Sequence, residues 1–538
     1  MALHSGPAWH PGNHRHHRRS APQTGKALGM SGLGQSGVTA VKWSAVSTLA
    51  RFVLQLVAQV ILARTLGPEI FGIFAIGMVV LTFATFFSGF GFSWSLLQRT
   101  TLCDEDVRFA WTWQLVVGLI TMLGVYLLAP TLAAYFREPR AQSVIEWLSV
   151  ACLLSAAAAP ATYLLQRDLN FRAGGLIQVG SYMAGYVAVG VPMAISGWGA
   201  TSLVAAWLVQ AAVVLVASYI VKPHAVRPLF WYADAASAVG TGRAVFLTNI
   251  VNWMLNNLDR VMIGRLLNAQ ALGLYNVAYN LAAMPNNLLL GALQPAFLAA
   301  GARLQTELER LGRAYFQMLA TIFVLVFPVF VFLALVSNDV VQLLYGSKWS
   351  DAGSVLSILF LSMPAYVIWG LSTPVLWNTG RKYYESVLQL PILAMGALGF
   401  YFFANQGIQA AATVAALVLV LRALVIGTTA FRALKLSWIE LLPNVGRGMI
   451  LCALCAISVK AGQAAVSDYA MPLLSLTAST FMALCMLALL LVVRPQLLGI
   501  ESAIMVIRFF PGLAPLLSRA GPGMQQGPII GPASEQRL

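Results

Sequence analysis

Charged side chains are scarce in this chain. Asp, Glu, Lys and Arg make up 9% of its 538 residues, whereas 59% of the residues are hydrophobic. An ordinary soluble domain is about 25% charged. A chain of this length with so few charges cannot cover a water-exposed surface, so its composition excludes a soluble globular protein.

Cysteine is also rare, with five residues, which excludes a disulfide-based scaffold. Cys452 and Cys455 have the CxxC spacing of redox and metal sites, but they lie in an apolar run without polar partners. The sequence contains no Ser/His/Asp arrangement, metal-ligand cluster or phosphate-binding loop. It therefore predicts no catalytic residue, no metal site and no enzyme activity.

Long apolar runs dominate the sequence. Each run of about 20 residues can cross a hydrocarbon core of about 30 Å as a helix. Fourteen such runs are expected at 38–64, 70–93, 109–130, 144–165, 175–196, 200–221, 244–267, 272–298, 314–336, 354–377, 384–404, 408–430, 445–466 and 471–493. The sequence therefore predicts an all-α polytopic membrane protein with about 14 transmembrane helices.

The distribution of the positive charge predicts the topology. The net charge is +15. If the N-terminus is inside, 24 Lys/Arg fall on the inner side and six on the outer side. This bias follows the positive-inside rule, so we expect both termini in the cytoplasm and no nucleic-acid partner.

A shift of the sequence by 201 residues indicates an internal repeat. It brings Arg64 onto Arg265 and Gly72 onto Gly273, at the same helix ends. Six helices per copy give two parallel six-helix bundles that face each other across a cleft. The expected segments are a disordered basic, His-rich cytoplasmic tail (1–37), an N-terminal bundle (38–232), a C-terminal bundle (233–432), an extra helix pair (433–495), and a cytoplasmic amphipathic segment with a disordered tail (496–538).

Polar residues inside the expected spans, most of them on the first helix of each bundle, are the candidate site. A charged side chain at the bilayer centre costs about 2.5–3.5 kcal/mol on insertion scales, and such residues usually face a bundle interior or a water-filled cavity. The candidates are Arg51, Gln55 and Gln59 on the first helix, Asn249, Asn252, Asn256, Asp259 and Arg260 on the seventh, Tyr279 and Asn280 on the eighth, and Arg422 on the twelfth. A purely structural role in pairing helices stays open for Asp259, Arg260 and Arg422.

Four stretches resemble a known family. They are LARTLGPEIFGIFAIG (62–77), LDRVMIGRLLNAQALGLYNVAYNL (258–281), NDVVQLLYGSKWSDAGSVLSIL (338–359) and PVLWNTGRKYYESVLQLP (374–391). Together, and in this order, they resemble the Wzx-type polysaccharide flippases of the multidrug/oligosaccharidyl-lipid/polysaccharide (MOP) exporter superfamily. Asn268 departs from the family, in which a glycine is usual at that position.

This resemblance implies a function. Such a protein moves a polyprenyl-diphosphate-linked oligosaccharide across the bacterial inner membrane by alternating access, for exopolysaccharide, capsule or O-antigen synthesis. It needs no cofactor other than a coupling ion, Na⁺ or H⁺, and it works beside a polysaccharide polymerase and export machinery. Arg51, Arg260 and Arg422 would bind the diphosphate, and Asp259 would hold Arg260 or bind the coupling ion. A guanidinium suits a diphosphate because it forms a bidentate fork.

Three other functions stay open. A multidrug exporter would favour acidic cavity residues, whereas the residues inside the spans include three arginines and one aspartate. An exporter of lipid II would share the need for arginine. A membrane polymerase or ligase for glycans would need catalytic groups that the short outer loops do not offer.

Overall fold

The structure, a computed structural model, describes the backbone of residues 30–88, 92–93, 96, 102–232, 235–303, 307–467 and 471–509. Side chains are described from residue 47 onward within these ranges, except at 88, 235–249, 292, 295–296, 299–300, 302–303, 382–383, 386 and 508–509. All regular secondary structure in the described part of the chain is helical. The side chain of Asn249 and the segments 1–29 and 510–538 lie outside the described residues.

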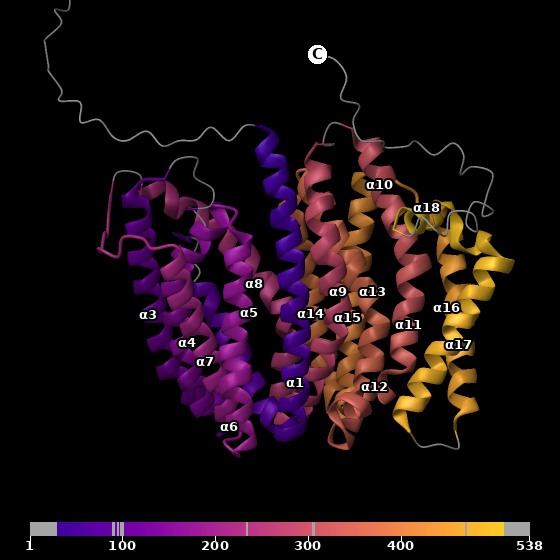
Figure 1. The fold of residues 1–538 in the computed structure, drawn as a ribbon, viewed down its shortest axis with the longest axis horizontal. Helices are drawn as coiled ribbons and strands as arrows, with labels where there is room; N and C mark the ends of the chain where they lie inside the picture. Colours follow the sequence, from indigo (N-terminus) through magenta and orange to yellow (C-terminus); the bar gives the residue numbers. More distant parts are fainter. Residues whose placement is uncertain are drawn as a thin grey trace, which may run out of the picture.

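The N-terminal half forms one bundle (Figure 1). Its helices are α1 (Met30–Ser88), α3 (Asp104–Tyr135), α4 (Ala141–Arg167), α5 (Phe171–Tyr182), α6 (Val191–Ile195) and α7 (Ala200–Val221). A π-helical segment, η1 (Met183–Gly190), joins α5 to α6 without a loop. Pro192 follows this segment and has no N–H to donate, so the regular helical bonding is interrupted there.

The C-terminal half continues in the same way. It contains α8 (Ala235–Leu266), α9 (Ala269–Arg303), α10 (Leu308–Thr321), η2 (Ile322–Val326), α11 (Phe327–Leu335), α12 (Ser337–Tyr345), η3 (Ser347–Trp349), α13 (Ser350–Asn378), α14 (Lys382–Phe403), η4 (Ala404–Gln406) and α15 (Ile408–Ala433). The chain ends with η5 (Ile439–Leu441), α16 (Leu442–Ala465), α17 (Pro472–Val493), η6 (Pro495–Leu498) and α18 (Gly499–Phe509). Helices α16 and α17 pack together at the edge of the molecule and contact α11 and α12 (Figure 1).

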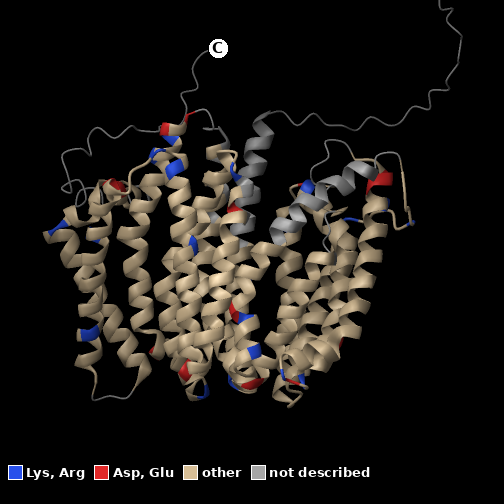
Figure 2. Ribbon diagram, turned by 180° about the vertical axis from the view of Figure 1, so that it is seen from behind, with Lys and Arg blue, Asp and Glu red and all other residues tan. Residues whose placement is uncertain are grey.

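Two ends of the molecule can be distinguished. The end where α1 begins and α18 lies is named the terminal end here, and the opposite end, with α6 and α12, the far end (Figure 1). Charged residues gather at both ends and are few between them (Figure 2). An apolar belt between two charged rims is what a bilayer requires, so this is a multi-pass membrane protein.

In the part of the chain that the structure describes, fewer helices qualify as membrane spans than the fourteen that the sequence predicts. Within the described residues, eleven helices are long and apolar enough to cross a membrane, and α8 and α9 are not among them. One of the eleven runs over Ser47–Phe87, where the sequence suggested two helices. There the chain turns at Gly67, whose φ of 77° suits glycine, and no loop separates the two helical parts. The number fourteen and the domain boundaries stay predictions, although α1 already begins at Met30, inside the expected disordered tail.

The main core joins the two halves. The largest buried cluster includes Ile76 of α1, Leu272 and Tyr275 of α9, and Leu356 of α13, all fully buried. Helix α1 packs on α9, and α13 packs on both α9 and α15. Buried apolar side chains thus join the two halves, and Tyr275 links this core to the polar residues inside the spans through Asp259.

Candidate substrate site

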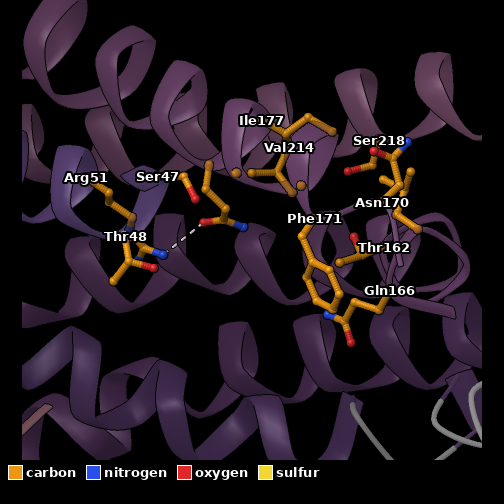
Figure 3. Close-up of a pocket in the computed structure, with 14 residues that line it drawn as sticks. Ser47, Thr48, Arg51, Thr162, Gln166, Asn170, Phe171, Ile177, Val214 and Ser218 are labelled. Carbon is orange, nitrogen blue, oxygen red and sulfur yellow. Dashed lines mark hydrogen bonds between the residues drawn. The ribbon is translucent and has the colours of Figure 1, made fainter. Parts of the chain in front are cut away.

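Arg51 lines a pocket inside the N-terminal half. The pocket has a volume of about 240 Å³ and is lined by residues of α1, α4, α5 and α7 (Figure 3). Its lining residues are Ser47, Thr48, Arg51, Thr162, Leu165, Gln166, Asn170, Phe171, Gly174, Gly175, Ile177, Gln178, Val214 and Ser218. We call this site the Arg51 pocket.

The chemistry of the Arg51 pocket suits an anion. Arg51 is half-buried, and its Nη1 donates to Oε1 of Gln178 at 3.1 Å. A guanidinium has five N–H donors, and Gln178 is its one partner among the described side chains. Hydroxyls and amides line the rest of the polar wall, and none of the described lining residues is acidic. The pocket therefore presents a positive charge that no carboxylate among the described lining residues balances.

A second polar site lies in the C-terminal half around Arg422. This side chain is only 1% exposed. Its Nη1 donates to Oδ1 of Asn256 at 2.7 Å and its Nη2 to Oδ1 of Asn252 at 3.3 Å. The guanidinium also lies 3.7 Å from the ring centroid of Trp369. Two amides and one aromatic face thus hold a cation that no described carboxylate approaches within salt-bridge distance.

Arg260 joins the same site through Asn256. Its Nη1 donates to the main-chain oxygen of Asn256 at 3.0 Å, and its Nε to Oδ1 of Asn276 at 3.2 Å. Nη1 also reaches Oδ1 of Asn257, and the guanidinium lies 4.3 Å from the ring centroid of Tyr279. Asn256 therefore connects α8 to α15 through Arg422, and Asn276 connects α8 to α9 through Arg260.

Asp259 has partners of its own. Its Oδ2 accepts the hydroxyl proton of Tyr275 at 2.5 Å, and its Oδ1 accepts the main-chain N–H of Arg260 at 2.8 Å. Adjacent residues on a helix point about 100° apart, which explains why Asp259 and Arg260 do not pair side chain to side chain. We call the whole site the Arg422 network. Its members are Asn252, Asn256, Asn257, Asp259, Arg260, Tyr275, Asn276, Tyr279, Trp369 and Arg422.

The structure thus separates the residues that the sequence grouped as one site. Asn252, Asn256, Asp259, Arg260, Tyr279 and Arg422 come together, whereas Arg51 lies in the other half. Gln55 is exposed, Gln59 is partly buried, and neither lines the Arg51 pocket. Asn280 is exposed and outside the network.

Sequence reasoning missed two important partners. Gln178 holds Arg51. Glu385 on α14 is only 3% exposed and accepts hydrogen bonds from Thr373 and Trp377, each at 3.0 Å. Glu385 forms no ion pair with Arg422, but it is a buried acid in the same half of the protein. Both residues lie within expected spans, so the rule that polar residues in apolar runs are informative would have found them.

Known proteins agree with this architecture. Two solved structures have a similar fold: the lipid II flippase MurJ in an inward closed conformation (13% identity, TM-score 0.68, covering 83% of this chain and 98% of MurJ) and an inward-facing multidrug resistance MATE transporter of the MOP superfamily (14% identity, TM-score 0.54, covering 72% and 94%). The fold is therefore that of the MOP-type membrane transporters.

The family follows from the sequence comparison. The chain belongs to the polysaccharide biosynthesis protein family, which it matches over residues 61–354. It is 28% identical over 334 residues to lipopolysaccharide biosynthesis protein WzxC of Escherichia coli, covering 61% of this chain and 67% of WzxC. It is also 28% identical over 358 residues to the succinoglycan biosynthesis transport protein ExoT of Rhizobium meliloti, covering 66% and 71%. The resemblance to Wzx-type flippases is thereby confirmed.

Proposed function

We propose that the protein moves a polyprenyl-diphosphate-linked oligosaccharide across the bacterial inner membrane by alternating access. The names of its relatives, which refer to lipopolysaccharide and teichuronic acid biosynthesis and to succinoglycan transport, support a polysaccharide precursor as the cargo. Both termini then face the cytoplasm, and the terminal end is the cytoplasmic end. The proposed partners are the lipid-linked oligosaccharide, the bilayer and the polymerase and export machinery that act on the product.

The single observation that carries this proposal is the unbalanced charge of Arg51. Among the described residues, this arginine has one amide partner and no carboxylate in its polar pocket, which suits the capture of an anionic group. A hydrogen bond to a charged group contributes about 1.5–3 kcal/mol. A diphosphate can accept two such bonds from one guanidinium and adds the attraction of opposite charges, which the neutral amide of Gln178 does not offer. The serine, threonine and asparagine groups make the rest of the pocket wall polar, which suits the phosphate and sugar oxygens of such a cargo.

Arg260 and Arg422 act at a later stage in this proposal. In the present conformation Arg422 is buried and both arginines are held by amides. The diphosphate can reach them only when α8 moves relative to α15, because Asn256 on α8 would have to release Arg422. A coupling ion, Na⁺ or H⁺, that acts on Asp259 would be one way to trigger this release.

The test is the accumulation of lipid-linked oligosaccharide on the inner leaflet of cells that lack the gene. Wild type should clear the intermediate, and Arg51→Ala should clear it about 10–100 times more slowly, since one charged interaction is lost. Arg51→Lys should recover part of the rate. Arg140→Ala is the matched control, because Arg140 pairs with Glu69 and Glu138 on the exposed surface. Full clearance by Arg51→Ala at equal protein abundance would refute the role of Arg51, and absence of any accumulated intermediate would refute the function.

The lipid II flippase fold raises a second candidate, transport of lipid II itself. Lipid II is also a diphosphate-linked lipid, so the Arg51 pocket would serve it equally well. The same assay separates the two, because the accumulated lipid would carry peptidoglycan sugars rather than a polysaccharide repeat unit.

A further inference from the structure

Two equivalent contacts join the two halves at the far end. In one, a glycine of the N-terminal half contacts the C-terminal half, and in the other, a glycine of the C-terminal half contacts the N-terminal half. Helix α1 resumes at Pro68 after Gly67, and α9 begins at Ala269, so these two helix starts lie side by side. A Cβ atom at Gly72 would overlap the carbonyl oxygen of Ala269. A Cβ atom at Gly273 would overlap the carbonyl oxygen of Pro68.

These contacts obey the shift of 201 residues found in the sequence. The shift relates Gly72 to Gly273 and Pro68 to Ala269. Gly72 contacts Ala269, and Gly273 contacts Pro68, so the two contacts are equivalent under the shift. Only glycine permits two helices to approach this closely, because any side chain would meet main-chain atoms that cannot rotate away. A reciprocal contact of this kind is what two similar bundles form across an axis between them.

Two arginines reinforce the same end. Arg64 of α1 donates from Nε to the main-chain oxygen of Leu344 at 2.7 Å and from Nη2 to that of Leu343 at 2.5 Å. Arg265 of α8 donates from Nη1 to the main-chain oxygen of Tyr135 at 2.5 Å. The acceptors lie in the last turns of α12 and α3. Carbonyl groups there lack helical donors and carry partial negative charge, so an arginine is a good cap.

The two caps cross between the halves in opposite directions. Arg64 belongs to the N-terminal half and caps α12 of the C-terminal half, whereas Arg265 belongs to the C-terminal half and caps α3 of the N-terminal half. Arg64 and Arg265 are again related by 201 residues. On the same side, Trp349 donates from Nε1 to the main-chain oxygen of Ala63 at 3.1 Å, next to Arg64.

We infer that Gly72, Gly273, Arg64 and Arg265 form the far-side gate of the transporter. The inference rests on the proposed alternating-access function, in which the far end must open to release cargo. The glycines let the helix starts seal against each other, and the arginines are positioning residues that hold the sealed state. Since all of these acceptors are main-chain oxygens, the contacts can break and re-form without leaving a carboxylate unpaired in the membrane.

The test measures the width of the far end directly. Spin labels are placed at Ser143 on α4 and Asp351 on α13, which are exposed and lie at the far end of the two halves, after replacement of the five native cysteines. Distances are measured by pulsed electron paramagnetic resonance in nanodiscs without substrate. The unmodified gate should give mainly one short distance.

Breaking the gate should lengthen that distance. Gly72→Ala and Gly273→Ala should move most molecules to longer distances, and the Arg64→Ala/Arg265→Ala double variant should raise the long-distance population about tenfold over the background variant. Arg64→Lys/Arg265→Lys should restore part of the short distance. The controls are Gly124→Ala on α3, where a Cβ meets nothing within 4 Å, and Arg140→Ala, whose ion pairs stay within one half.

An unchanged distance in the arginine double variant would overturn the gate, even if the glycine variants fail to fold. This result is independent of the cargo, since no substrate is present. If the proposed cargo is wrong, the accumulation assay will show no lipid-linked oligosaccharide, while the gate variants will still lengthen the measured distance.

Discussion

The Arg51 pocket and the Arg422 network hold a membrane-buried guanidinium in two different ways. In the pocket, one amide contacts Arg51 and no acidic residue is among the described lining residues. In the network, Arg422 and Arg260 share their surroundings with Asp259 and Glu385, and aromatic rings cover both guanidinium groups. The first arrangement leaves most donors of the guanidinium without a described protein partner, whereas the second surrounds the guanidinium with amides and aromatic rings, although Nε of Arg422 has no hydrogen-bond partner there. The comparison shows that an arginine inside the membrane is not evidence for binding until its partners are known.

The difference between the two sites is removed most directly by placing a carboxylate next to Arg51. Gln178→Glu places an acid where an amide now accepts from Nη1 at 3.1 Å. The new pair neutralises the pocket, so transport should fall about 10–100-fold, as for a lost charged interaction. Clearance of the lipid-linked intermediate at matched protein abundance measures this fall. Gln178→Leu is the control and should retain most activity, because it leaves the cation of Arg51 unbalanced.

The opposite change removes the cation of the network. Arg422→Ala leaves Asn252 and Asn256 without their donor and opens a hole beside Trp369. An unsatisfied polar group costs about 1–3 kcal/mol where it is buried, and these two amides are partly buried, so the melting temperature in detergent should drop by several degrees. Arg51→Ala should leave it nearly unchanged, since Arg51 has a single partner. Equal melting temperatures for the two variants would mean that the network does not stabilise the fold.

A smaller effect is expected from Tyr275→Phe. The variant removes one hydroxyl, which donates to Oδ2 of Asp259 at 2.5 Å, and keeps the ring in the core. A buried carboxylate that loses a donor costs about 1–3 kcal/mol. Thermal stability should therefore fall by less than in Arg422→Ala, and the change should be absent when Asp259→Ala, which removes the acceptor, is already present. Additive losses in the double variant would argue against a direct Tyr275–Asp259 interaction.

The smallest effect should come from Asn280. The sequence placed this residue with the cavity-lining group, but its side chain is exposed and outside the network. Asn280→Ala should change neither transport nor melting temperature, whereas Asn256→Ala should lower the melting temperature. A transport defect in Asn280→Ala with normal abundance would show that a further surface takes part.

Much of the candidate site could be predicted because polar residues are conspicuous in apolar runs. Arg51, Arg260, Arg422 and Asp259 were found in this way. Their grouping could not be predicted. Arg51 bonds to a residue 127 positions away and Arg422 to one 166 positions away, and such distances in sequence say nothing about proximity. Spacing along one helix indicates which residues share its face, but not which neighbouring helix covers that face.

The sequence by itself determined the class of this protein, because scarce charge and repeated apolar runs leave only a helical membrane fold. It also determined which side chains could not lie in lipid without a partner. Tertiary structure alone decided the partners: it placed Gln178 against Arg51, and it set Asn252 and Asn256 against Arg422. The physical reason is that a membrane helix must satisfy its polar groups within the protein, but many neighbouring helices can do so, and only their packing selects among them.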